Sequence, residues 1–87
     1  MRVDGVPVTG DRPQDLSVPD VEKAISAMRA DLPEVRSEQL RIIEVVDSDT
    51  IYLGYREAGS TFVTRYVVRR KHGQWHYTWR IAFGPRP

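Results

Sequence analysis

Residues 62–84 read FVTRYVVRRKHGQWHYTWRIAFG, and the alternation within this stretch decides the fold of the 87-residue chain. His72-Gly73 near its middle suits a two-residue hairpin turn, because such turns favour residues that accept a positive φ. On both sides of the turn, apolar and polar residues alternate with a period of two, which is typical of half-buried antiparallel strands. Counting outward from the turn predicts one core-facing set: Trp75, Tyr77, Trp79, Ile81 and Phe83, opposite Arg70, Val68, Tyr66, Thr64 and Phe62.

Two further breaks upstream, AGST at 58–61 and DSDT at 47–50, separate runs rich in Val, Ile, Tyr and Thr. Gly59-Ser60 suits a type II′ turn, which has Gly at its first central position. The register set by this turn adds three residues to the core face: Ile51, Leu53 and Tyr55. The pattern therefore predicts an antiparallel meander of four strands, at about 39–47, 51–58, 61–71 and 74–83.

The length of the loop between the first two predicted strands determines which of their residues face the core. A three-residue loop at 48–50 places Ile43 and Val45 on the core face, whereas a loop of two or four residues would bury Glu44. We therefore expect the three-residue loop.

In the segment SVPDVEKAISAMRADLP at 17–33, apolar residues recur at the spacing of an α-helix instead of a strand. Ser17 and Asp20 have the spacing of a capping box, Pro19 lies in the first turn, and Pro33 ends the helix. Apolar residues follow at helical spacing on one stripe: Val18, Val21, Ala24, Ile25, Met28 and Leu32. The expected fold is α+β, with one N-terminal helix at about 18–32 packed on the aromatic face of a curved four-stranded antiparallel meander.

A chain of this length forms one domain, because it buries only about 60 % of its unfolded surface and cannot support two cores. The first sixteen residues contain Gly5, Pro7, Gly10 and Pro13 among alternating valines. They are predicted to form a flexible arm or a short edge strand, and residues 17–87 to form the single α+β domain.

The composition is that of a soluble globular domain, with 40 % apolar and 29 % charged residues. The chain has no cysteine, so a zinc site would require its two histidines together with carboxylates. We expect no metal and no cofactor. Since no apolar run resembles a membrane span or a signal peptide, the cytoplasm is the default expectation, although an exported chain whose signal had been removed would read the same.

The net charge of +1 hides an asymmetry between the two parts of the chain. Residues 60–87 contain six basic and no acidic side chains, whereas residues 1–59 contain seven basic and twelve acidic ones. Such a split indicates either a binding half or neutralisation between neighbouring strands.

The face of the sheet opposite the helix is predicted to bind a partner. It is too apolar for a solvated face and has too many arginines for a closed core. Arg65 is expected opposite Arg80, with Glu44 reaching Arg65 across Gly54, although long arginines can also lie along a sheet with their heads in water. The predicted contact residues are Tyr52, Arg56, Val63, Arg65, Val67, Arg80 and Glu44.

A nucleic-acid-binding hairpin is the alternative. It would use the basic residues of the last hairpin, Arg69, Arg70, Lys71 and His76, together with Arg80. The modest isoelectric point of about 8.1 argues against it, because phosphate-driven binding usually comes with a strongly basic domain.

The chain carries no recognisable catalytic motif: no phosphate loop, dinucleotide fingerprint or nucleophile elbow is present. A small-molecule pocket between helix and sheet is a third hypothesis. The expected core aromatics argue against such a cavity because they would fill it: Phe62, Tyr66, Tyr77, Trp79 and Phe83. We therefore expect a protein that is not an enzyme.

One helix followed by a four-stranded meander resembles the cystatin-like half-cone and the related ketosteroid-isomerase-like superfamily. The segment YVVRRKHGQWHYTW at 66–79 is similar to the hairpin of small members of the latter, in which a basic turn and a Gly precede a Trp-bearing strand. The enzymes of that superfamily add helices over a deep pocket, and no catalytic pattern of theirs can be placed on this chain. The resemblance implies dimerisation or partner binding through the sheet face opposite the helix. The expected function is a non-catalytic binding or assembly module whose partner is another protein or a second copy, away from membranes.

Overall fold

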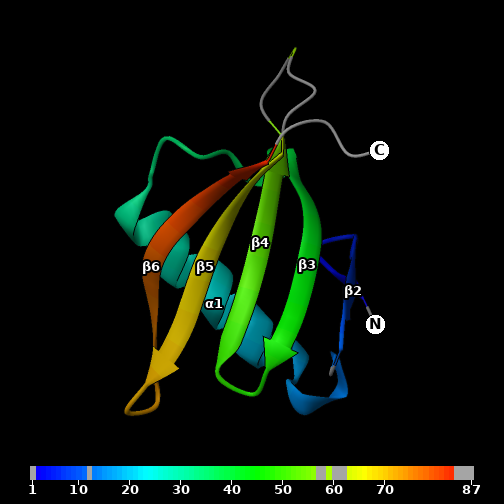
Figure 1. Cartoon of the computed structure of the whole chain (residues 1–87), viewed down its shortest axis with the longest axis vertical. Helices are drawn as coiled ribbons and strands as arrows, with labels where there is room; N and C mark the ends of the chain where they lie inside the picture. The colour runs from blue at the N-terminus through cyan, green and yellow to red at the C-terminus, as the bar shows by residue number, and fades with distance from the viewer. Residues whose placement is uncertain (1, 12, 57–58, 60–62, 84–87) are drawn as a thin grey trace.

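The computed structural model describes residues 2–11, 13–56, 59 and 63–83, with the backbone alone for 81–83. Within these residues the chain forms one α-helix and a single sheet with the strand order β1-β2-β3-β4-β5-β6 (Figure 1). The predicted α+β class with one helix is confirmed. The predicted number of four strands is wrong, because the N-terminal residues also join the sheet.

The two additional strands are β1 (Arg2–Val3) and β2 (Val6–Gly10), which form a short antiparallel hairpin. Strand β2 then runs parallel to β3 (Leu40–Asp47), with Val8 beside Ile43, so the sheet is mixed rather than antiparallel. Val3 and Val8 are buried in the common core. Gly and Pro, which usually mark turns, conceal this strand in the sequence.

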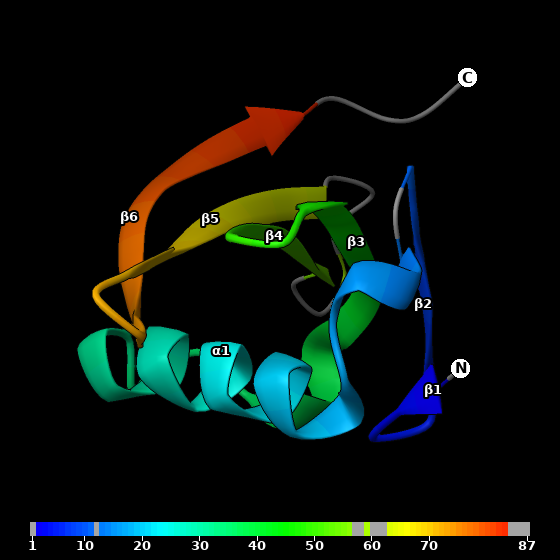
Figure 2. The ribbon, with the colours of Figure 1, turned by 90° about the horizontal axis from the view of Figure 1, so that it is seen from below.

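Helix α1 (Val18–Asp31) begins as predicted, with a capping box. The Asp20 backbone N–H donates to the Ser17 hydroxyl over 3.3 Å, and the Ser17 backbone N–H donates to the Asp20 carboxylate over 3.1 Å. The Ser17 hydroxyl also donates to the Asp20 carboxylate, over 2.9 Å. The two hydrogen bonds that this carboxylate accepts, from the Ser17 backbone N–H and from its hydroxyl, lower the pKa of Asp20 because they favour its charged form. The helix lies against one face of the sheet and leaves the other without a helix among the described elements (Figure 2).

The remaining strands are β4 (Thr50–Arg56), β5 (Val63–Lys71) and β6 (Gln74–Phe83). Strands β4 and β5 pair in the predicted register, with Leu53 beside Tyr66. The β5–β6 turn is also as predicted, because His72 and Gly73 have φ values of 52° and 77°. The strand ends predicted at 57–58 and 61–62, and Ser60 of the preceding turn, lie outside the described residues.

The β3–β4 loop differs from the prediction. Asp47 pairs with Thr50, which leaves a loop of two residues instead of three. A register shift lies between Val45 and Asp47, so Ile43 and Val45 still face the core and are fully buried. The argument against a two-residue loop fails because a β-bulge absorbs the extra residue and keeps Glu44 out of the core.

A further register shift lies at the start of β3, between Leu40 and Ile42. Another bulge, in β6, changes the faces of the last strand. Val68 pairs with Tyr77 but Val67 pairs with Trp79, so Thr78 is the extra residue. The Thr78 hydroxyl donates to the Val67 carbonyl over 2.9 Å and so holds the bulge. Trp79 and Arg80 therefore lie on the faces opposite to those predicted.

Two predictions are therefore wrong: Trp79 is not a core residue, and Arg80 does not oppose Arg65. Trp79 is 53 % exposed, whereas Arg80 pairs with Tyr66 and Arg65 pairs with Ile81. Phe62 and the side chain of Phe83, also expected in the core, lie outside what the structure describes.

The core lies between α1 and the sheet and contains the predicted helix stripe, except that Val18 is exposed. Trp75 closes one end and is buried, with the Arg70 guanidinium 5.0 Å from its ring centre. This is a cation–π contact at the end of the β5–β6 hairpin. Arg70 also forms ion pairs with Asp49 at 3.0 Å and with Asp20 at 3.6 Å, which connect the β5–β6 hairpin to the β3–β4 turn and to the helix.

Candidate functional site

The face of the sheet opposite α1 is the first candidate site, and we call it the open face. Cross-strand partners share a face, so the register of β3 to β6 defines its members. Its described members are Ile42, Glu44, Asp47, Thr50, Tyr52, Gly54, Arg56, Val63, Arg65, Val67, Arg69, Lys71, Gln74, His76 and Trp79.

The centre of the open face is an ion pair between Arg65 and Glu44. The Arg65 Nη2 lies 2.8 Å from the Glu44 Oε1, and the two side chains are 10 % and 27 % exposed. The pair spans β4 at Gly54, as predicted. A Cβ atom at Gly54 would lie 3.1 Å from Ile42 Cβ and from Val63 Cγ1, so this position is already closely packed without a side chain. Because Gly54 has no side chain, Glu44 of β3 and Arg65 of β5 can contact each other across β4.

An exposed tryptophan lies beside this pair. Trp79 is opposite Val67, and the Arg69 guanidinium lies 5.6 Å from the centre of the indole ring. Val67 is fully buried although it is not part of the core under the helix. The open face therefore has a packed apolar floor with an aromatic ring and arginines above it.

The structure brings together six of the seven predicted partner-binding residues on the open face. Arg80 is the exception, because the Thr78 bulge turns it toward the helix side. Trp79 was missed for the same reason. The only trace of the bulge in the sequence is Thr78 itself, a residue whose hydroxyl can bond a backbone carbonyl.

The residues of the alternative basic site do not form one surface. Arg69, Lys71 and His76 lie on the open face, but Arg70 lies on the opposite face. There its Nε donates to Asp49 and its Nη2 donates to the Ser48 carbonyl. Arg70 therefore has a structural role at the helix side of the hairpin.

A second candidate is a hollow of about 340 Å³ on the helix side, next to the segment that connects α1 to β3. It lies between the segment that includes the 3-10 turn η2 (Ser37–Gln39) and strands β4 to β6. We call it the tyrosine cavity. Its described lining residues are Glu34, Val35, Arg36, Gln39, Tyr55, Thr64, Tyr66 and Arg80.

Tyr55 is the buried polar residue of the tyrosine cavity. It is 3 % exposed, and its hydroxyl has no hydrogen-bond partner among the described residues. Burial raises the pKa of Tyr55 to about 12, so the phenol stays neutral. Its ring meets that of Tyr66 edge to face at 5.7 Å, and Tyr66 meets Tyr77 in the same way at 5.9 Å.

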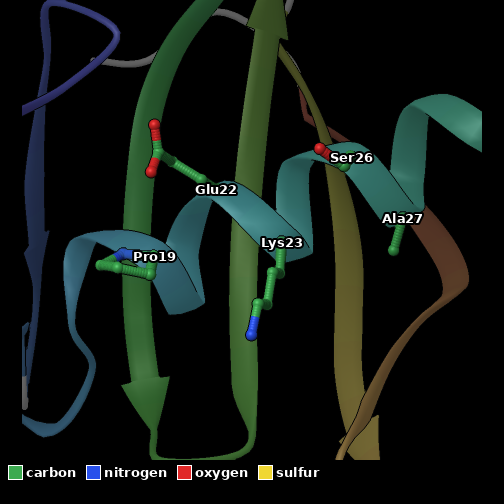
Figure 3. A pocket seen from close by; sticks show the side chains of 5 residues that line it. All are labelled: Pro19, Glu22, Lys23, Ser26 and Ala27. Carbon is green, nitrogen blue, oxygen red and sulfur yellow. The ribbon is translucent and has the colours of Figure 1, made fainter.

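A third hollow lies on the outer surface of α1, lined by Pro19, Glu22, Lys23, Ser26 and Ala27. Figure 3 shows that the Glu22 and Lys23 side chains point away from each other, so no polar groups converge there. Within the described residues, no three His, Asp or Glu side chains are grouped to hold a metal ion. No described helix has the length and apolar character needed to cross a membrane.

Comparison of the chain with models of protein families, with curated proteins and with solved structures found no match. The resemblance to the cystatin-like and ketosteroid-isomerase-like half-cone therefore stays a prediction. The candidate function consequently rests on the open face and the tyrosine cavity themselves.

Proposed function

We propose that this chain is a non-catalytic binding module whose open face docks a protein partner with an apolar centre and carboxylates around it. The observation that carries the proposal is the exposed indole of Trp79, stacked beside Arg69 on a sheet face that no described helix covers.

The chemistry of the open face supports a protein interface. Trp, Tyr and Arg are the residues that most often dominate binding energy at interfaces, and the face holds all three types around a packed floor. Tyr52 and Val63 are half-buried next to this floor. A partner that covers the Trp79 ring would remove a large apolar area from water.

The charge of the open face favours an acidic protein over a second copy. Its formal charges are those of Arg56, Arg65, Arg69 and Lys71 against Glu44 and Asp47, a net charge of +2. Two copies packed on this face would bring like charges together, which is unfavourable in an interface. Carboxylates on a partner would instead complement Arg69 and Lys71.

The charges argue against nucleic acid as the partner of the open face. The chain has a net charge of only +1, and Arg70 of the basic hairpin is bound to acidic groups of its own chain. Phosphate-driven binding depends on several basic side chains on one surface.

We expect Trp79→Ser to abolish most partner binding without unfolding the protein. A peptide display library selected on the wild-type chain should yield peptides that contain both aromatic and acidic residues. Titration calorimetry should then show at least about tenfold weaker binding of these peptides to Trp79→Ser, the loss typical of a hot-spot residue.

The matched control is Val18→Ser, because Val18 is exposed on α1, away from the open face. It should leave peptide affinity unchanged. Equal affinity of the selected peptides for Trp79→Ser and wild type would contradict the proposal. A dimeric mass by light scattering that Trp79→Ser makes monomeric would replace the acidic partner by a second copy. Tight, salt-sensitive binding of oligothymidylate that Trp79→Ser abolishes would replace it by nucleic acid.

A further inference from the structure

Strand β6 forms one edge of the sheet, with β5 as its neighbour on the inner side and no described strand beyond it (Figure 1). Residues of an antiparallel strand alternate between bonding the neighbouring strand and directing their backbone N–H and C=O groups away from it. Every second residue of β6 before the Thr78 bulge therefore presents both groups to the outside. In the described part of the chain, the backbone hydrogen bonds outside helices and strands do not involve β6.

The edge formed by β6 is long and accessible. The strand has ten residues, whereas β1 at the opposite edge has two. It contains neither Pro nor Lys, the residues that commonly protect an edge from a further strand. The side chains of His76, Thr78 and Trp79 are exposed, and α1 packs on one face of β6 without running along its outer edge (Figure 2).

We propose that the partner of the open face binds in an extended conformation, as an additional strand along the outer edge of β6. This inference rests on the proposed function and adds the conformation of the partner to it. The bound segment is an acidic peptide stretch whose backbone pairs with β6. Its alternate side chains extend over the open face beside Trp79.

The position of Trp79 favours the edge over the middle of the open face. Val67, its cross-strand partner in β5, is buried, whereas Trp79 is 53 % exposed. Of the described large apolar side chains, only Trp79 and Val18 of α1 are exposed. The apolar surface available to a partner thus lies on the edge strand itself. Side chains of an adjacent strand come within about 5 Å of their cross-strand neighbours, so an added strand can cover the indole.

The charges next to this edge favour an acidic strand. Strands β5 and β6 contain no Asp or Glu, and Arg69 and Lys71 lie on the open face one strand in from the edge. A second copy is disfavoured, because a bulge and a charge pointing to the inner face both hinder pairing between edges. Strand β6 has both features, at Thr78 and Arg80. Two copies would bring both obstacles twice, whereas a regular acidic strand meets each once.

The test uses backbone methylation of a peptide. The probe is the tightest-binding peptide from the display selection on the wild-type chain, made synthetically with one backbone nitrogen methylated at a time. Methylation removes one N–H donor and keeps every side chain. In an added strand every second residue bonds β6, so affinity should fall at least about tenfold at alternate positions. At the positions between them it should change by less than about twofold, which makes these positions the matched controls.

Hydrogen exchange of the ¹⁵N-labelled protein gives a second readout, on the protein itself. The same unmethylated peptide should slow the exchange of alternate β6 amides, those that face away from β5, at least about tenfold, because each gains a hydrogen bond. The amides of β1, at the opposite edge of the sheet, should exchange at the same rate with and without the peptide.

Failure of the added strand is distinguishable from failure of the proposed function. Methylation losses that do not alternate, or unchanged exchange of every β6 amide, would overturn the added strand. If Trp79→Ser still weakened peptide binding in that case, the open face would remain the docking surface. Equal peptide affinity for Trp79→Ser and wild type would overturn the proposed function and this inference together.

Discussion

Replacement of Gly10 by alanine is expected to lower the free energy of unfolding by about 3 kcal/mol. Gly10 ends β2 beside Val45 with a φ of 110°, where residues other than Gly are strained by roughly 1–3 kcal/mol. A Cβ atom would also overlap the Val45 backbone, with its nitrogen only 2.7 Å away and its carbonyl oxygen closer still. Overpacking of this kind costs about 1–3 kcal/mol. Urea denaturation followed by circular dichroism measures the change.

Gly73→Ala is the matched control for this prediction. Gly73 also has a positive φ, 77°, but a Cβ atom there would meet nothing within 4 Å. Its expected cost is therefore the backbone strain alone, about 1–2 kcal/mol. Equal losses in the two variants would mean that Gly10 is not pressed against β3, and would contradict the parallel β2–β3 pairing.

Glu44→Gln is expected to lower the free energy of unfolding by about 2 kcal/mol. Glu44 pairs with the Arg65 guanidinium at 2.8 Å, and the arginine side chain is only 10 % exposed. Breaking a fully buried pair costs roughly 3–5 kcal/mol because a charge loses its compensation. The 27 % exposure of Glu44 and the retained amide oxygen reduce that figure. The same urea titration measures it.

The second ion pair of similar length provides the comparison. Arg36 and Glu38 lie 2.7 Å apart, but their side chains are 73 % and 61 % exposed. Water screens such a pair, so Glu38→Gln should change stability by less than about 0.5 kcal/mol. If both substitutions had the same small effect, the Arg65–Glu44 pair would not be the buried centre of the open face.

Local sequence patterns predicted the parts of the fold that depend on neighbouring residues. The capping box at Ser17, the His72-Gly73 turn and the β4–β5 register each arise from short-range rules that the structure obeys. Glu44 and Arg65 were also paired correctly, because Gly54 leaves the space between them in any register that keeps β4 and β5 aligned.

The missed features depend on contacts that alternation does not reveal. Three register shifts each insert one residue, between Leu40 and Ile42, between Val45 and Asp47, and at Thr78. Each shift changes the face on which the next residues of its strand lie. Strand β2 pairs with β3 across more than thirty residues, and its Gly and Pro content conceals it. The Thr78 bulge has the largest consequence, since it exchanges the faces of Trp79 and Arg80.

The central claim is that the Thr78 bulge turns Trp79 out of the core. The chain has two tryptophans, so Trp75→Phe leaves Trp79 as the only indole, and Trp79→Phe provides the buried Trp75 as the reference. We predict that Trp79 emits at nearly the wavelength of a free indole in water and that acrylamide quenches it readily, in contrast to Trp75. Blue-shifted emission from Trp79 with the protection shown by Trp75 would contradict the bulge, and with it both the open face and the tyrosine cavity.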